Sequence, residues 1–197
     1  MKIDRDFYLR ENSANVAREL LGKLLVVPGE RGNRVSGMIV ETEAYFGVTD
    51  RAAHSYGGRR TRRTETMYAV GGTVYIFFIY GMYYQFNIVT GPVDQPHAVL
   101  IRALEPVEGI EVMRSRRGEM KDKNLTSGPG KLTIAMGIDR ALNGEDLLGR
   151  KVWLEEQKKI PAKNIAAGKR IGVDYAGEDA EKRWRFWLKD NDFVSKK

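Results

Sequence analysis

The spacing of apolar and polar residues along the chain predicts a protein built mainly of short strands. Runs of apolar, β-branched and aromatic residues that stop at turn residues are typical of strands. Such runs predict strands over 23–27, 39–45, 98–103, 152–155, 170–173 and 184–188, with a turn at 29–33 after the first of them.

Helical spacing is found in fewer places. A segment with apolar residues one turn apart follows the capping residues Asn12 and Ser13 and ends at Gly22. Proline near the start of a segment and glycine after its end also favour a helix. These signals predict helices over 13–21, 105–117 and 131–136, the last after the capping sequence SGPG.

The most apolar stretch, residues 73–89, breaks only once, at Gly81. Two strands rich in Val, Ile, Phe and Tyr around one glycine predict a β-hairpin with Tyr80, Gly81 and Met82 at its tip. Tyrosine and methionine are unusual at a tip, where polar residues are the norm. From the residues alone, both side chains are expected to pack back onto the domain.

Together these elements predict a single domain over residues 1–197 with a mixed α/β (α+β) fold. Its centre is expected to be a curved, mostly antiparallel sheet with a protruding hairpin and few helices. A chain of 197 residues can bury about 70% of its unfolded surface, and no composition shift marks a linker.

The charge favours a polyanionic partner. Lys and Arg outnumber Asp and Glu by 33 to 26, for a net charge of +7. The chain has no cysteine and only two histidines, which excludes disulfides, thiolate sites and multi-histidine metal sites. The N-terminus lacks the apolar core of a signal peptide and no apolar run is long enough for a membrane helix, so we expect an intracellular protein without a membrane partner.

Candidate chemistry is concentrated in residues 35–63. Side chains alternate along a strand, so Glu41, Glu43 and Tyr45 share one face. His54 and an arginine-rich run follow. Two acids on one face usually mark a solvated surface, but their closeness to imidazole and guanidinium groups favours a site. The sequence alone does not separate Glu41 from Glu43.

A family resemblance is carried by VETEAYFG at residues 40–47, AAHS, GGR, YGMYYQFN and LIRALEP, and it extends through SGPGKL and RIGVDYAGE to WRFWL. In this order the segments resemble the alkyladenine DNA glycosylase family, the mammalian type of 3-methyladenine DNA glycosylase. The resemblance covers nearly the whole chain, so it is far more specific than one short motif.

The resemblance implies roles for individual residues. Glu43 aligns with the general base that activates water, Arg102 with an arginine that helps hold this water, and Ile171 with a residue whose carbonyl binds it. Tyr45 and His54 align with opposite walls of a pocket for a flipped base. Other implied pocket residues are Phe77, where a tyrosine is usual, and Asn87, which would clash with the amino group of guanine.

The resemblance also implies contacts with DNA. Tyr80 would fill the gap left by the extruded nucleotide, with Met82 beside it. The implied phosphate contacts are Arg59, Thr61, Arg63, Lys131 and Arg140. For each of these residues a plain structural or surface role is the alternative.

The resemblance thus implies a monofunctional glycosylase that removes alkylated or deaminated purines from double-stranded DNA without a metal or organic cofactor, and we expect a monomer. The implied substrates are 3-methyladenine, 7-methylguanine, hypoxanthine and ethenoadenine. Neutral bases need protonation to leave, and the candidate proton sources are His54 and a second water. Two alternatives remain. The chain could be a bifunctional glycosylase with Lys131 as an amine nucleophile, or a basic nucleic-acid-binding module without catalysis.

Overall fold

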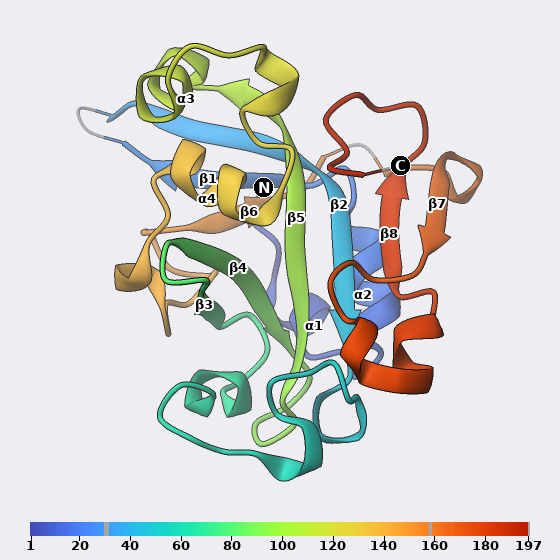
Figure 1. Cartoon of the computed structure of the whole chain (residues 1–197). Helices are drawn as coiled ribbons and strands as arrows, with labels where there is room; N and C mark the ends of the chain where they lie inside the picture. The colour runs from blue at the N-terminus through green and yellow to red at the C-terminus, as the bar shows by residue number, and fades with distance from the viewer. Residues whose placement is uncertain (30–31, 158, 197) are drawn as a thin grey trace.

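An antiparallel sheet forms the centre of the protein, as a computed structural model of residues 1–29, 32–157 and 159–196 shows (Figure 1). Within these ranges the sheet has eight strands. They are β1 (Leu24–Pro28), β2 (Arg34–Tyr45), β3 (Val74–Ile79), β4 (Tyr83–Thr90), β5 (His97–Glu108), β6 (Trp153–Glu155), β7 (Ile165–Gly168) and β8 (Arg185–Leu188). The order β3-β4-β5-β2-β1-β6 describes the main path, and β8 joins β2 to β7. The expected α+β fold around a curved antiparallel sheet is confirmed.

Strand β2 is the point at which the sheet branches. It pairs with β5 from Ser36 to Tyr45, while its other edge pairs first with β1 and then, at Glu41–Glu43, with β8. The register between β2 and β5 shifts on both sides of Glu41. Such bulges bend a strand and re-aim its side chains. Residues 41–43 consequently lie in the middle of the sheet, and all three are fully buried.

Four α-helices lie around the sheet in the described ranges: α1 (Arg5–Tyr8), α2 (Ser13–Leu20), α3 (Ile110–Arg117) and α4 (Pro129–Met136). Helix α2 is capped by Asn12, whose side chain accepts a hydrogen bond from the Asn15 N–H, and it packs on β2 and β5 as its apolar spacing predicts. Helix α4 packs on β4. Short 3-10 helices lie at Gly47–Thr49, Tyr56–Gly58, Glu65–Tyr68, Asp122–Asn124, Arg140–Leu142, Ala162–Asn164 and Asp174–Glu181.

The predicted hairpin is β3 and β4, joined by Tyr80, Gly81 and Met82. The φ angles of Tyr80 and Gly81 are 55° and 67°. Two consecutive positive φ angles match the twist of the flanking strands, as in type I′ hairpin turns, and a tyrosine adopts this conformation less readily than glycine. The expectation that the tip side chains pack back onto the domain is wrong, since Tyr80 is 81% exposed and Met82 is 63% exposed.

Two predicted elements are wrong. The helix expected over 105–117 begins only at Ile110, because β5 continues through Pro106 to Glu108. Proline is tolerated there because β4 pairs with β5 only as far as Leu100 and a single bridge to Ser127 follows at Ala103. At Pro106 no strand of the described residues pairs with this edge. The strand expected over 170–173 is a loop, in which Gly172 has a φ angle of 75°.

Smaller differences concern ends and turns. Helix α4 begins after Gly128 without a side-chain cap, so the SGPG segment does not cap it through Ser127. The turn expected at 29–33 falls partly on residues 30–31, which lie outside the described residues. Within the ranges that the structure covers, no helix is both long and apolar enough to cross a membrane.

Candidate active site

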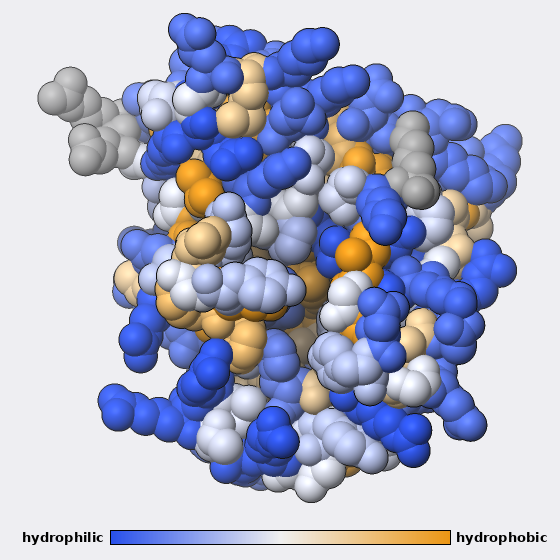
Figure 2. Space-filling view, viewed as in Figure 1, coloured by the Kyte–Doolittle hydropathy of each residue, from blue (hydrophilic) through white to orange (hydrophobic). Residues whose placement is uncertain are grey.

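A cavity of about 250 Å³ opens beside the hairpin. Its wall comes from β3, β4, β5, the segment after β2 and the loop 171–175. Figure 2 shows a hollow near the centre of this face, with apolar residues inside and mainly hydrophilic residues around it. The volume lies below the range of about 300–1,000 Å³ that is usual for drug-sized ligands. The cavity therefore suits one small group.

Glu43 lies directly behind the wall of this cavity. Its Oε1 accepts a hydrogen bond from the backbone N–H of Ile171 at 2.8 Å and lies 3.3 Å from a guanidinium nitrogen of Arg102. Its Oε2 accepts a hydrogen bond from the Tyr45 hydroxyl at 2.8 Å. All three partners line the cavity, whereas Glu43 itself has no exposed surface. A carboxylate oxygen has two lone pairs, so Oε2 retains acceptor capacity for one more partner.

Glu41 is equally buried, but its partners differ. Its Oε1 accepts hydrogen bonds from Arg102 at 3.1 Å and Arg185 at 3.0 Å, and its Oε2 accepts one from the Ser195 N–H at 2.7 Å. Of these three, only Arg102 borders the cavity. Both acids thus share Arg102, and burial works to lower the pKa of this guanidinium, but Glu43 and Glu41 outweigh it and raise the pKa.

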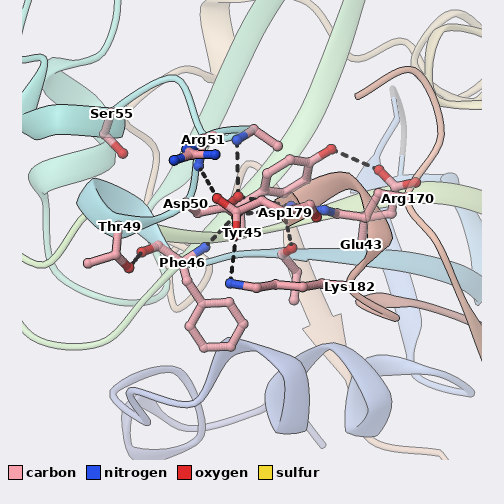
Figure 3. A network of polar contacts seen from close by, with 12 residues as sticks. Glu43, Tyr45, Phe46, Thr49, Asp50, Arg51, Ser55, Arg170, Asp179 and Lys182 are labelled. Atoms are coloured by element: carbon pink, nitrogen blue, oxygen red, sulfur yellow. Dashed lines mark hydrogen bonds and ion pairs between the residues drawn. The ribbon is translucent and has the colours of Figure 1, made fainter. Parts of the chain in front are cut away.

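Tyr45 connects Glu43 to a second cluster (Figure 3). Burial, followed by the negative charge of Glu43, raises the pKa of the Tyr45 hydroxyl well above its usual value, so it stays a donor. Arg170 lies over the Tyr45 ring, 4.7 Å from its centroid. The same guanidinium forms a fully buried ion pair with Asp50.

Sequence reasoning missed this Asp50–Arg170 cluster. The two residues are 120 positions apart, so no local pattern joins them, and 170–173 was expected to be a strand. Asp50 also accepts hydrogen bonds from the backbone N–H groups of Phe46 and Ala52, at 3.1 and 3.0 Å. The only signal in the sequence was an aspartate next to a predicted site.

His54 lines the cavity and lies against Phe77, with ring centroids 3.7 Å apart and a 26° angle between the rings. Its Nδ1 is 3.1 Å from the hydroxyl of Tyr75, another residue that sequence reasoning missed. Burial, followed by repulsion from Arg63 and Arg59, lowers the pKa of His54 to about 4. The imidazole is therefore neutral at pH 7, which argues against the expected role as a proton source.

Asn87 reaches the cavity from β4. Its amide nitrogen donates hydrogen bonds to the backbone carbonyls of Tyr75, at 3.1 Å, and Gln85, at 3.2 Å. These contacts with carbonyls of β3 and β4 fix the amide, so it presents a rigid group at the wall. Phe77 does not line the cavity; it packs behind His54 and Tyr75, which do, and it lines a neighbouring hollow.

The residues expected to contact DNA fall into two groups. Some line the cavity or the neighbouring hollow, and the others line neither. Tyr80 stands between the cavity and the neighbouring hollow, which Arg63 and Arg140 also line. Arg59, Thr61 and Lys131 are exposed, but line neither of these two hollows. Thr61 is also partly engaged within the protein, because its hydroxyl lies 3.3 Å from that of Thr64. Met82 is exposed on the hairpin tip.

Comparison with known proteins agrees with this geometry. A family model described as methylpurine-DNA glycosylase matches residues 6–192. A protein of Desulfitobacterium hafniense (strain Y51), provisionally named 3-methyladenine DNA glycosylase, is 50% identical over 100% of this chain and 99% of its own length. A relative from Encephalitozoon cuniculi (strain GB-M1), provisionally named DNA-3-methyladenine glycosylase, is 50% identical over 92% of this chain and 88% of its own length. The chain therefore belongs to the methylpurine-DNA glycosylase family, which makes it a DNA-repair hydrolase.

Proposed function

We propose that this protein removes alkylated or deaminated purines from double-stranded DNA by hydrolysing their N-glycosidic bonds. The substrate class is 3-methyladenine, 7-methylguanine, hypoxanthine and ethenoadenine. The two relatives described above carry names that contain 3-methyladenine. The other bases extend this range, and cationic alkylpurines should react fastest because their leaving group is already activated.

One observation carries the proposal: a buried carboxylate whose three hydrogen-bonding and ionic partners all line one small cavity. Hydrolysis of a glycosidic bond needs a carboxylate that activates water and stabilises the developing positive charge at C1′. Glu43 has this chemistry, and Arg102 and Ile171 border the cavity beside it. In this mechanism the Ile171 carbonyl and Arg102 hold the water while Glu43 takes its proton.

The leaving base would occupy the cavity after it flips out of the duplex. Flipping costs a few kcal/mol, which stacking on aromatic side chains helps to offset. Tyr45 and His54 supply aromatic faces at the cavity. Asn87, held by two carbonyls, would exclude bases with an exocyclic amino group at its position. Phe77 stacks behind His54 and lacks the hydroxyl that is usual in the resembling family.

The duplex would lie against the hairpin tip. Tyr80 would enter the space left by the flipped nucleotide, and Met82 would contact the adjacent base pair. The exposed cations Arg59, Arg63, Lys131 and Arg140, together with Thr61, would contact phosphates. This requires no metal or organic cofactor, and a monomer suffices.

Base release from a duplex with a single hypoxanthine or ethenoadenine, followed by alkaline cleavage, tests the proposal. The wild type should cleave, and Glu43→Gln should bind the duplex without cleaving it. Methylated DNA is the second substrate. Failure of the wild type to release any of these bases would leave a damage-binding module as the better description.

Borohydride trapping tests the lyase alternative. Lys131 is exposed on α4 and does not line the cavity. A lysine nucleophile has to reach C1′ of the flipped nucleotide. We therefore expect no covalent protein–DNA adduct, and an adduct lost in Lys131→Ala would establish the bifunctional enzyme instead.

A further inference from the structure

We propose that Arg170 is a positioning residue for the reaction, because it holds in place two of the three groups that bind Glu43. This inference rests on the proposed function of Glu43. Arg170 does not line the cavity, so it would act through its neighbours.

Both terminal nitrogens of Arg170 are bound by groups of the protein, whereas its buried Nε has no hydrogen-bond partner among the described residues. Its two terminal nitrogens bind the carboxylate of Asp50 at 2.5 and 2.8 Å. The same nitrogens donate hydrogen bonds to the backbone carbonyls of Ala44, at 3.0 Å, and Asp179, at 3.1 Å. Only the planar fork of a guanidinium can make such a set of contacts. The side chain therefore has one orientation.

The first group that Arg170 holds is the ring of Tyr45. The guanidinium lies over this ring at 4.7 Å and over the ring of Trp184 at 5.0 Å. It also binds the carbonyl of Ala44, the residue before Tyr45. Backbone and ring of Tyr45 are thus both fixed, and the hydroxyl that donates to Oε2 of Glu43 is fixed with them.

The second group is the backbone N–H of Ile171, the residue directly after Arg170. Residues 170–173 form a loop, so no strand ladder holds this N–H in place. The buried ion pair with Asp50 anchors the loop instead. Arg170 thereby determines where the Ile171 N–H meets Oε1 of Glu43.

Asp50 and Asp179 extend the anchor to the segment that carries His54. Asp50 accepts hydrogen bonds from Phe46 and Ala52 N–H, and Asp179 accepts one from Arg51 N–H at 2.9 Å. Figure 3 shows these contacts converging between the segment after β2 and the C-terminal part of the chain. The loop 171–175 and the segment that carries His54 lie on two sides of the cavity. Both are therefore held by one buried ion pair.

The test is Arg170→Lys, which keeps the positive charge but loses the fork and the flat stacking face. Arg5→Lys is the matched control, because Arg5 also binds a carbonyl and a carboxylate, those of Gly71 and Asp146, away from the cavity. Trp184→Leu is a milder variant that removes one stacking face of Arg170 without touching Glu43.

Two quantities are measured well below each variant's melting temperature. One is the single-turnover rate of base release, and the other is the affinity for a duplex with a tetrahydrofuran abasic site, which has no base to stack. Binding to the abasic duplex also counts the folded molecules, so rates are expressed per active site. We expect Arg170→Lys to release base at least about tenfold more slowly, with abasic binding and the Arg5→Lys rate close to wild type.

Two outcomes for a folded Arg170→Lys variant overturn the inference. A wild-type rate per active site in Arg170→Lys would show that Arg170 stabilises the fold only. A parallel loss of abasic binding would show general damage to the DNA-binding face. If Arg170→Lys does not fold, Trp184→Leu decides, since an unchanged rate there contradicts the inference and a slower rate with intact binding supports it. No base release by the wild type overturns the proposed function, and this inference with it.

Discussion

Glu41 and Glu43 are two residues apart on the same face of β2, both are fully buried, and both bind Arg102, yet their surroundings differ. Glu41 is bound by Arg185 of β8 and by the N–H of Ser195 near the C-terminus. Glu43 is bound by Tyr45 and Ile171, which line the cavity. The Glu41 carboxylate joins β2 to β8 and to the segment near the C-terminus. The Glu43 carboxylate lies where a ligand can approach its partners.

The comparison teaches that residue type, burial and charge partner do not define a catalytic candidate. Glu41 and Glu43 are alike in all three respects. They differ in where their partners other than Arg102 lie. Those of Glu43 line the cavity and those of Glu41 do not, and only the three-dimensional structure determines this. Neutralising each acid in turn should therefore have opposite consequences for activity and stability.

The largest expected effect is the loss of base release in Glu43→Gln. Removing a general base lowers rates by about 10²–10⁴-fold. Stability should change far less than in Glu41→Gln, because Arg102 keeps its ion pair with Glu41 and the ion pair between Arg185 and Glu41 is untouched. Single-turnover assays and urea unfolding on the same preparations check this, and a Glu43→Gln variant that retains wild-type turnover would contradict the assigned role.

Glu41→Gln should lose stability instead. The change leaves Arg185 without its carboxylate and Arg102 with Glu43 alone. Removing one partner from a buried ion pair costs about 3–5 kcal/mol in the free energy of unfolding. Urea unfolding measures it. A loss below about 1 kcal/mol would mean that Glu41 is not the structural member of the pair.

The stability of the protein should also depend on pH through His54, which lines the cavity. Its pKa in the folded protein is about 4, below the unfolded value near 6.5, so between these pH values the unfolded state binds the extra proton. The contribution of neutral His54 to the free energy of unfolding is therefore fully present above pH 6.5. It falls by up to about 3 kcal/mol as the pH falls toward 4. The slope should be smaller in His54→Gln. Identical slopes in both proteins would show that His54 is not buried as a neutral group.

The smallest expected effect concerns a single hydrogen bond, the one that Glu41 accepts from the Ser195 N–H. Ser195→Pro removes the N–H that donates to Oε2 of Glu41, whereas Ser195→Ala keeps it. Hydrogen bonds to charged groups contribute about 1.5–3 kcal/mol, so the proline variant should lose roughly that much stability. The alanine variant is the control and should stay close to wild type, because the Ser195 hydroxyl has no partner among the described residues. Equal stability of the two variants would show that this N–H contributes little.

Much of the fold could be predicted from sequence because its signals are local. The strand-forming run of β2, the Asn12 cap of α2 and the break at Gly81 each act within a few residues, and all three were correctly placed. The failures were also local signals, but tertiary pairing overrode them. Pro106 resembled a helix start, yet pairing with Gly37 keeps it in β5.

The site divides in the same way. The sequence by itself determined the residue types and, through the strand period of two, the shared face of Glu41, Glu43 and Tyr45. It did not determine which acid has all its partners at the cavity, since Arg185 and Ile171 approach from more than 120 residues away. Only the tertiary structure decided this, because a buried carboxylate acquires its role from the groups that fold against it.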